Sequence, residues 1–185
     1  MNRRTWNVCL VGSNGVGKTS LVRRYVENAF VHDFMPTFGV HLSRKTIHTD
    51  KAQVDLRLWD LAGDDEFLLS KDLAAAARVQ DVRTARASAY ILVADVTRKA
   101  TLEQVIERQE RIARDKASKH LPAVPFVLAL NKSDLSRWEF DELEVRSLVP
   151  GWQIIPTSAK TSEGVTRMFE MIAFTLLDQP DDSDY

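Results

Sequence analysis

Hydrophobic residues along the chain fall into short runs that alternate with stretches of helical periodicity. The short runs are rich in β-branched and other apolar residues, and Gly, Pro or Asn bounds several of them, which is typical of buried strands. They predict strands at residues 5–11, 40–48, 53–59, 89–95, 124–130 and 153–157.

Three of the intervening stretches place apolar residues on one helical face: the stretch that starts at Lys18, residues 101–116 and residues 165–176. Strands that alternate with helices predict an α/β domain with a largely parallel sheet, covered by helices on both faces. Ligands of such sheets bind beyond the carboxyl ends of the strands. The loops that follow the predicted strands are therefore the candidate functional site.

The composition fits one globular domain and excludes several functional classes. The chain has 185 residues, of which 44% are hydrophobic and 28% charged, and its net charge of -1 offers no basic surface for nucleic acid or an anionic membrane. The single cysteine, Cys9, lies in an apolar run, which excludes a disulfide framework and indicates a reducing compartment. The N-terminal residues lack the apolar core of a signal peptide, and the longest apolar runs are too short to span a bilayer. We therefore expect a cytoplasmic protein that binds no nucleic acid.

The segment GSNGVGKT, residues 12–19, lies between the first predicted strand and a predicted helix, and it matches the pattern G-x-x-x-x-G-K-[ST]. Glycines let the backbone turn so that successive N–H groups face phosphate oxygens, and the helix that follows adds the positive end of its dipole. Lys18 is placed to reach the β- and γ-phosphates, and the Thr19 hydroxyl to ligate Mg²⁺. The alternative is a glycine-rich turn with an accidental lysine, but the strand–loop–helix context favours a nucleoside triphosphate. The expected nucleotide contacts are Asn14, Gly15, Val16, Gly17, Lys18, Thr19 and Ser20.

Two further loops carry residues suited to recognising guanine. The segment NKSD follows the strand at 124–130, and its Asp134 can accept two hydrogen bonds from the guanine N1–H and amino groups. Adenine lacks this pair of donors, so such a site discriminates against it by roughly 10⁴-fold. Lys132 can lay its aliphatic stem over the base, and Asn131 can tie neighbouring loops together. NKSD alone is a common polar turn, but a second base-side loop, TSAK, follows the last strand, with the expected contacts Ser158, Ala159 and Lys160.

Together these segments resemble the small GTPases of the Ras superfamily over nearly the whole chain, and the resemblance is closest to the Rab branch. FMPTFGVHL, residues 34–42, resembles the first switch, and LWDLAGDDEF, residues 58–67, resembles the second. The resemblance implies that Thr37 and Asp60 hold Mg²⁺ together with Thr19. It also implies that Gly63 donates its N–H to the γ-phosphate and that Phe30 packs against guanine. The catalytic set implied in this way is Lys18, Thr37, Gly63 and Asp64.

The resemblance also implies an architecture and a mode of action. The expected fold is the P-loop NTPase fold of small GTPases, with a mostly parallel six-stranded sheet, one antiparallel edge strand and helices on both faces. Residues 1–178 form the expected GTPase domain and residues 179–185 a short acidic tail. In the implied mode of action, GTP and Mg²⁺ order the two switch loops, and hydrolysis of GTP to GDP releases them. A monomer of this kind works with effector, exchange and GTPase-activating proteins, whose identities the resemblance does not supply.

Asp64 is the first departure from the family pattern, which usually has glutamine at this position. Glutamine can both accept a hydrogen bond from the attacking water and donate one to the transition state, whereas an ionised aspartate only accepts. The aspartate also brings negative charge towards a transition state already rich in it. The alternative is that the carboxylate polarises the water as a base. The interpretation we adopt predicts slow intrinsic hydrolysis.

Three other departures leave alternatives open. Asn14 replaces a small residue, where it either crowds an arginine finger supplied by an activating protein or is merely tolerated in a turn. The segment between Asp60 and Asp95 is about nine residues longer than is typical of Rab proteins. The extra residues form either a longer surface helix or a partner-binding surface. A remoter option is that one of the arginines in this segment reaches the γ-phosphate. Neither an N-myristoylation signal nor a C-terminal cysteine is present, so recruitment to membranes would need a protein partner or a longer native C-terminus.

Three functions compete for this set of residues. The first is a GTP-binding switch that hydrolyses GTP slowly and signals through protein contacts. The second is a GTP-bound pseudo-GTPase scaffold with negligible hydrolysis, which shares every binding residue and is favoured only by Asp64 and Asn14. The third is an ATP-dependent phosphotransferase, against which Asp134 and the TSAK loop argue.

Overall fold

The structure is a computed structural model that describes residues 3–32, 37, 39–50, 52–61 and 86–178. Six strands form one sheet in the order β2-β3-β1-β4-β5-β6. All neighbouring strands are parallel except β2 and β3, which form the antiparallel edge. The strands are β1 (Arg3–Val11), β2 (Val40–His48), β3 (Gln53–Leu61), β4 (Ala89–Asp95), β5 (Phe126–Asn131) and β6 (Ile154–Thr157). The predicted six-stranded, mostly parallel sheet with one antiparallel edge strand is thus confirmed.

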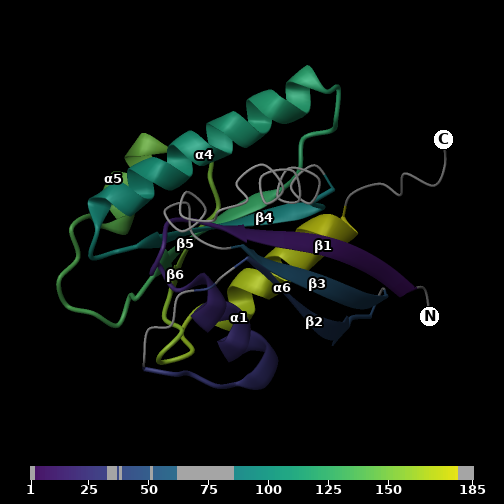
Figure 1. Ribbon diagram of the computed structural model, residues 1–185, viewed down its shortest axis with the longest axis horizontal. Coiled ribbons are helices and arrows are strands. Elements are labelled where there is room, and N and C mark those ends of the chain that lie inside the picture. Colours follow the sequence, from purple (N-terminus) through teal and green to yellow (C-terminus); the bar gives the residue numbers. More distant parts are fainter. Residues whose placement is uncertain (1–2, 33–36, 38, 51, 62–85, 179–185) are drawn as a thin grey trace.

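Helices cover both faces of this sheet (Figure 1). The described helices are α1 (Lys18–Glu27), α4 (Lys99–Ser118), α5 (Glu142–Leu148) and α6 (Val165–Leu177). One apolar cluster joins α1 and α6 to the sheet, with Leu21 and Phe169 among its buried members. A second cluster joins α4 and α5 to the other face, with Leu102 and Val145 fully buried. The sheet is therefore buried on both sides, as a parallel sheet requires.

Burial along the strands follows their place in the sheet. Every residue of the central strand β4 is buried, which matches the continuous apolar run that predicted it. The edge strand β2 instead has only half-buried and exposed positions. The parallel strands end at the same edge of the sheet, so the loops after β1, β3, β4, β5 and β6 meet there.

Helix α5 is the one described helix that the hydrophobic pattern did not predict. It spans only seven residues, too few for a clear helical periodicity. Its start nevertheless has a local signal, because the Asp141 side chain caps the helix by accepting a hydrogen bond of 2.8 Å from the Glu144 backbone N–H. The spacing Asp-x-x-Glu is that of a capping box, and it would have revealed this helix.

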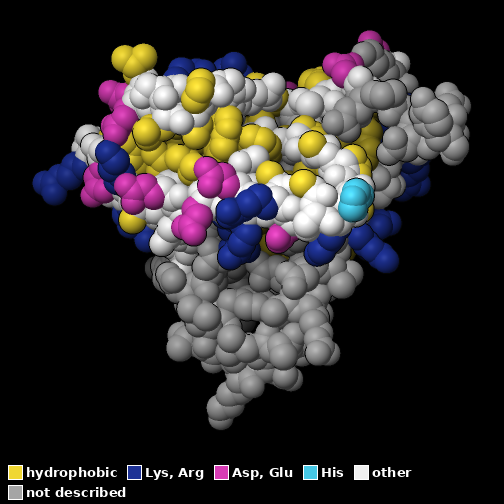
Figure 2. Space-filling view, turned by 90° about the horizontal axis from the view of Figure 1, so that it is seen from above, with side chains coloured by type: hydrophobic (Ala, Val, Ile, Leu, Met, Phe, Trp, Pro, Cys, Tyr) yellow, Lys and Arg dark blue, Asp and Glu magenta, His cyan; other side chains and the backbone are white. Residues whose placement is uncertain are grey.

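The α4–α5 side of the molecule has a mixed surface. Figure 2 looks down on this side and shows hydrophobic side chains gathered in a band, with acidic side chains at its left end. A groove between the two helices has an apolar floor that includes Leu102 and Ile106, and carboxylates such as Glu103 and Glu107 line it. The hydrogen bond that Lys99 donates to Glu144 raises the pKa of that lysine.

Within the described part of the chain, no helix combines the length and the apolar character needed to cross a membrane.

Gly164 provides a stability test of the junction between β6 and α6. It lies directly before α6 with a φ of 67°, and a Cβ at this position would lie 2.1 Å from the carbonyl oxygen of Pro156. We expect Gly164→Ala to lower the free energy of unfolding by about 2 to 3 kcal/mol, measured by urea denaturation, through backbone strain and this clash. Gly151→Ala is the matched control, because Gly151 also has a positive φ (+84°) but open space around it, and it should cost only about 1 kcal/mol. Equal losses in the two variants would contradict the role of the clash.

Candidate nucleotide-binding site

The loop between β1 and α1 is held in a shape that only glycine permits. Gly17 has a φ of +99°, and a Cβ there would lie 2.3 Å from the side-chain nitrogen of Asn131. That nitrogen donates a hydrogen bond of 2.8 Å to the Val16 carbonyl. Asn131 therefore ties the loop after β5 to the loop after β1, as the sequence predicted for a residue of this kind at this position.

Lys18 points its ammonium group back along the same loop. Its Nζ donates hydrogen bonds of 2.8 Å to the Gly12 carbonyl and 3.0 Å to the Ser13 carbonyl, and the side chain is 6% exposed. Ser13 in turn contacts the Gln104 side chain of α4 through its hydroxyl. The charge is thus fixed beside the loop whose backbone is expected to face phosphate, at the N-terminal end of α1.

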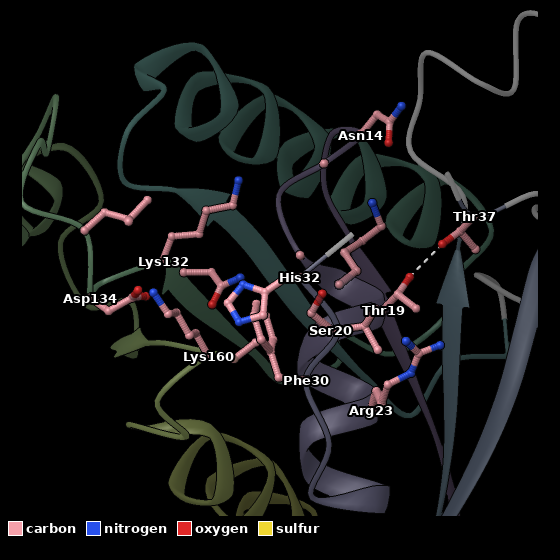
Figure 3. Close-up of a pocket in the computed structure, with 17 residues that line it drawn as sticks. Asn14, Thr19, Ser20, Arg23, Phe30, His32, Thr37, Lys132, Asp134 and Lys160 are labelled. Atoms are coloured by element: carbon pink, nitrogen blue, oxygen red, sulfur yellow. Dashed lines mark hydrogen bonds between the residues drawn. The ribbon is translucent and has the colours of Figure 1, made fainter. Parts of the chain in front are cut away.

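The base-side loops meet on the other side of the cavity. The Ser158 hydroxyl donates a hydrogen bond of 2.6 Å to the Asp134 carboxylate, so the loops after β5 and β6 are joined at the residue expected to read guanine. Figure 3 shows Asp134 and Lys160 at one end of the cavity and Thr19 and Thr37 at the other. Phe30 lies at the cavity with its ring edge-on to His32, at 5.0 Å between centroids.

Three oxygen-bearing side chains gather at the end near Thr37. The Thr19 hydroxyl donates to Asp60 Oδ2 at 2.5 Å and lies 2.6 Å from the Thr37 hydroxyl. Among the described residues, the second oxygen of Asp60, Oδ1, is buried without a hydrogen-bond partner. Burial raises the pKa of Asp60, and the hydrogen bond from Thr19 and the charge of Lys18 only partly offset this. A buried carboxylate with an unused oxygen beside two hydroxyls fits a hard cation such as Mg²⁺.

Most of these groups line one cavity of about 320 Å³, whereas Asp60 lies behind Thr19 and is not part of the lining. Most of the described residues predicted to bind nucleotide line it: Asn14, Gly15, Gly17, Lys18, Thr19, Ser20, Phe30, Thr37, Asn131, Lys132, Asp134, Ala159 and Lys160. Val16 instead packs in the core and takes part through its carbonyl, and Ser158 acts through its bond to Asp134. Gly63, Asp64 and most of the long segment after Asp60 lie outside the described residues.

Sequence reasoning missed several residues of this region. Arg23, Val31, His32 and Leu135 also line the cavity. Arg24 of α1 donates from Nε to the Ala159 carbonyl at 2.8 Å and from Nη2 to the Lys160 carbonyl at 3.1 Å, which clamps the TSAK loop against α1. Each of these side chains sits within a few residues of a motif, but their roles depend on distant partners that no local pattern reveals.

Comparison with known proteins agrees with this geometry. A family model described as the Ras family matches residues 7–178. The Ras-related protein O-RAL of Diplobatis ommata is 31% identical over 165 residues, which cover 88% of this chain and 74% of the relative. The Ras-related protein Rab-7L1 of Rattus norvegicus is 32% identical over 177 residues, which cover 90% and 79%. The GTP-binding protein Di-Ras1 of Homo sapiens is 30% identical over 167 residues, which cover 89% and 78%.

The fold and this match define the class: the chain belongs to the Ras family of small GTPases. Membership implies a switch that binds guanine nucleotide. The similar proteins carry Ral, Rab, Di-Ras and Rap names at closely similar identity, so the comparisons favour no single branch.

Proposed function

We propose that this protein is a molecular switch that binds GTP and GDP with Mg²⁺ and hydrolyses GTP slowly. One observation carries the proposal: the buried Lys18 at the phosphate loop and the Ser158–Asp134 pair at the base loops face the same cavity from different strands. That separation suits a nucleotide, with a triphosphate at one end and a purine at the other. In this proposal residues 1–178 form the GTPase domain, and residues 179–185 form a short acidic tail.

The metal-binding residues in this proposal are Thr19, Thr37 and Asp60. The support is the orphaned Asp60 oxygen and the close approach of the three side chains. These three side chains would hold Mg²⁺, which would supply positive charge to offset the negative charge that develops on the phosphates during hydrolysis. Thr37 belongs to the first switch, so its hydroxyl would couple the conformation of that loop to the bound nucleotide.

Nucleotide identity gives the direct test of this function. The purified chain should release GDP or GTP on denaturation, identified by chromatography, and it should bind GDP far more tightly than ADP in calorimetry with Mg²⁺. Recovery of adenine nucleotides, or equal affinities for the two diphosphates, would refute the proposal and favour a phosphotransferase that uses the same phosphate loop.

The weak hydrolysis rests on Asp64. We expect Asp64→Gln to raise the single-turnover rate of GTP hydrolysis by about 10-fold, because glutamine can donate a hydrogen bond to the transition state and removes a repelling charge. The measurement is phosphate release from preloaded protein with Mg²⁺. Asp65→Gln, the same change at the next position, is the control and should leave the rate near that of the native chain. An equal rate in Asp64→Gln would contradict this explanation of slow hydrolysis, and a lower rate would indicate that the native carboxylate assists the water.

The second candidate is a pseudo-GTPase scaffold that keeps nucleotide as a structural ligand. The native residues Asp64 and Asn14 favour it, and the nucleotide-binding residues do not discriminate because both functions share them. Turnover measured with and without candidate activating proteins separates them, because a switch must complete its cycle and a scaffold need not.

The remaining parts of the proposal concern partners and branch. We propose a cytoplasmic monomer that acts through effector, exchange and activating proteins and reaches membranes through such partners. We place it on the Rab side of the family because Thr37-Phe38-Gly39 follows the Rab T-x-G pattern and the spacing from Thr37 to Asp60 equals that of typical Rab proteins.

A further inference from the structure

Asp95, at the end of β4, is a buried carboxylate that belongs to none of the nucleotide-binding motifs. Its side chain is 1% exposed. Its backbone N–H donates to the Thr101 hydroxyl at 2.9 Å, which fixes the residue where β4 turns into α4. A carboxylate buried this deeply must be compensated by positive charge or hydrogen bonds. Its partners therefore show what the carboxylate does.

Two cations share one oxygen of Asp95. Lys132 Nζ lies 2.6 Å from Oδ2, and Arg98 Nε donates to the same oxygen at 3.1 Å. The backbone N–H and the hydroxyl of Thr97 donate to Oδ1 at 3.0 and 2.7 Å. Burial opposes ionisation, but the bonds from Lys132 and Thr97 outweigh it and hold the pKa of Asp95 below its usual range. The ionised carboxylate is thus fully coordinated.

The two cations lead to different parts of the nucleotide-binding site. Lys132 lines the cavity on the base side, and Figure 3 shows its side chain extending away from Asp134. Arg98 continues in the other direction, because its Nη2 donates a hydrogen bond of 3.0 Å to the Asn14 carbonyl in the phosphate loop. The chain Lys132–Asp95–Arg98–Asn14 therefore connects the loop that would read the base with the loop that would hold the phosphates.

We propose that Asp95 is a positioning residue that fixes Lys132 along the base and, through Arg98, braces the phosphate loop at Asn14, and so slows the release of guanine nucleotide. This inference rests on the proposed function. Lysine is a flexible side chain that loses much rotamer freedom when it is ordered. Asp95 has already ordered it before the base arrives, so the nucleotide meets a pre-formed platform.

The bond to Arg98 is also suited to this role. The Arg98 side chain is 45% exposed, so it stays in place through its two bonded partners rather than through burial. Its guanidinium spans the two partners with separate N–H groups, a geometry that a lysine ammonium could not reproduce. Loss of Asp95 would free both arms at once, whereas loss of Arg98 would free only the phosphate-loop arm.

Release of a fluorescent GDP analogue from the full chain, chased with excess GDP in the presence of Mg²⁺, tests the proposal. We expect Asp95→Asn to speed release about 10-fold, because the amide oxygen still accepts from Thr97 while the charge that holds Lys132 and Arg98 is gone. Arg98→Met should speed it about 3-fold. Asp115→Asn, an exposed carboxylate change on α4, is the matched control and should release at the native rate.

A double-mutant cycle between Asp95→Asn and Lys132→Met separates positioning from a general effect on the fold. If Asp95 acts through Lys132 and Arg98, Asp95→Asn should speed release about 10-fold in the native chain. In the Lys132→Met background it should speed release only about 3-fold, because only the Arg98 arm is left to lose. Two effects that multiply independently, or an Asp95→Asn variant that releases at the native rate, would overturn the inference while leaving GDP binding intact. If Asp95→Asn does not fold, Arg98→Met decides on the phosphate-loop arm, and a native release rate there overturns the brace. A native chain that binds no GDP would overturn the proposed function, and this inference with it.

Discussion

Asp134→Asn is expected to weaken GDP binding by about 1,000-fold, because it removes an ionised acceptor of two hydrogen bonds from guanine. A hydrogen bond to a charged group contributes roughly 1.5 to 3 kcal/mol, so the loss of both amounts to about 3 to 6 kcal/mol. The asparagine amide can instead donate to a carbonyl at C2 of the purine. Xanthosine diphosphate, which has that carbonyl, should therefore bind the variant better than it binds the native chain. Calorimetry with the two diphosphates measures both changes.

The control for this substitution is Asp50→Asn, the same chemical change in the turn between β2 and β3. That turn lies at the end of the strands away from the cavity, because β3 begins just after the turn and the cavity lies beyond the other end of β3. GDP affinity should not change there. A loss of less than about 3-fold in Asp134→Asn would mean that this carboxylate does not contact the base, and that its bond from Ser158 merely joins two loops.

Local sequence pattern predicted most of the sheet because each strand carries its own signal. The first six residues of β4, at positions 89–94, form an uninterrupted apolar run, and such a run has few interpretations other than a central strand. Strand boundaries were less accurate: β1 begins at Arg3 and β3 continues to Leu61, beyond the predicted ranges. Pairing with neighbouring strands sets these ends, so the sequence of one strand alone does not contain them.

The candidate site likewise contains residues that local motifs predict and residues that only the folded chain brings together. Gly17, Lys18 and Asp134 lie in short motifs whose spacing encodes their chemistry, and the structure places all three at one cavity. Asp95 and Arg24 have no such motif. Asp95 is separated from Lys132 by a whole helix and a strand, and Arg24 from Ala159 by most of the chain, so only the folded sheet brings each pair together. Residues that lie outside a motif and bond partners far away in the sequence are therefore harder to predict than residues within a motif.

Lys18→Met is expected to lower GDP affinity by about 1,000-fold and GMP affinity by less than about 10-fold, since removal of one partner of a buried charge pair typically costs 2 to 5 kcal/mol. The difference arises because the ammonium is held at the phosphate loop by the Gly12 and Ser13 carbonyls. From there it would meet the β-phosphate, which GMP lacks. Competition binding against a fluorescent GDP analogue measures both affinities. The ratio of the two separates a phosphate contact from a loss of structure.

Lys116→Met is the matched control for Lys18→Met, because the two lysines are almost equally buried, at 7% and 6% exposed. Lys116 lies at the C-terminal end of α4, which in a sheet of this topology is the end away from the cavity. Its loss should therefore leave the ratio of GDP to GMP affinity unchanged even if the fold is weakened. A parallel fall of both affinities in Lys18→Met would show that the ammonium supports the loop rather than the nucleotide. The two carbonyls that it bonds would then be its main partners in the bound state as well.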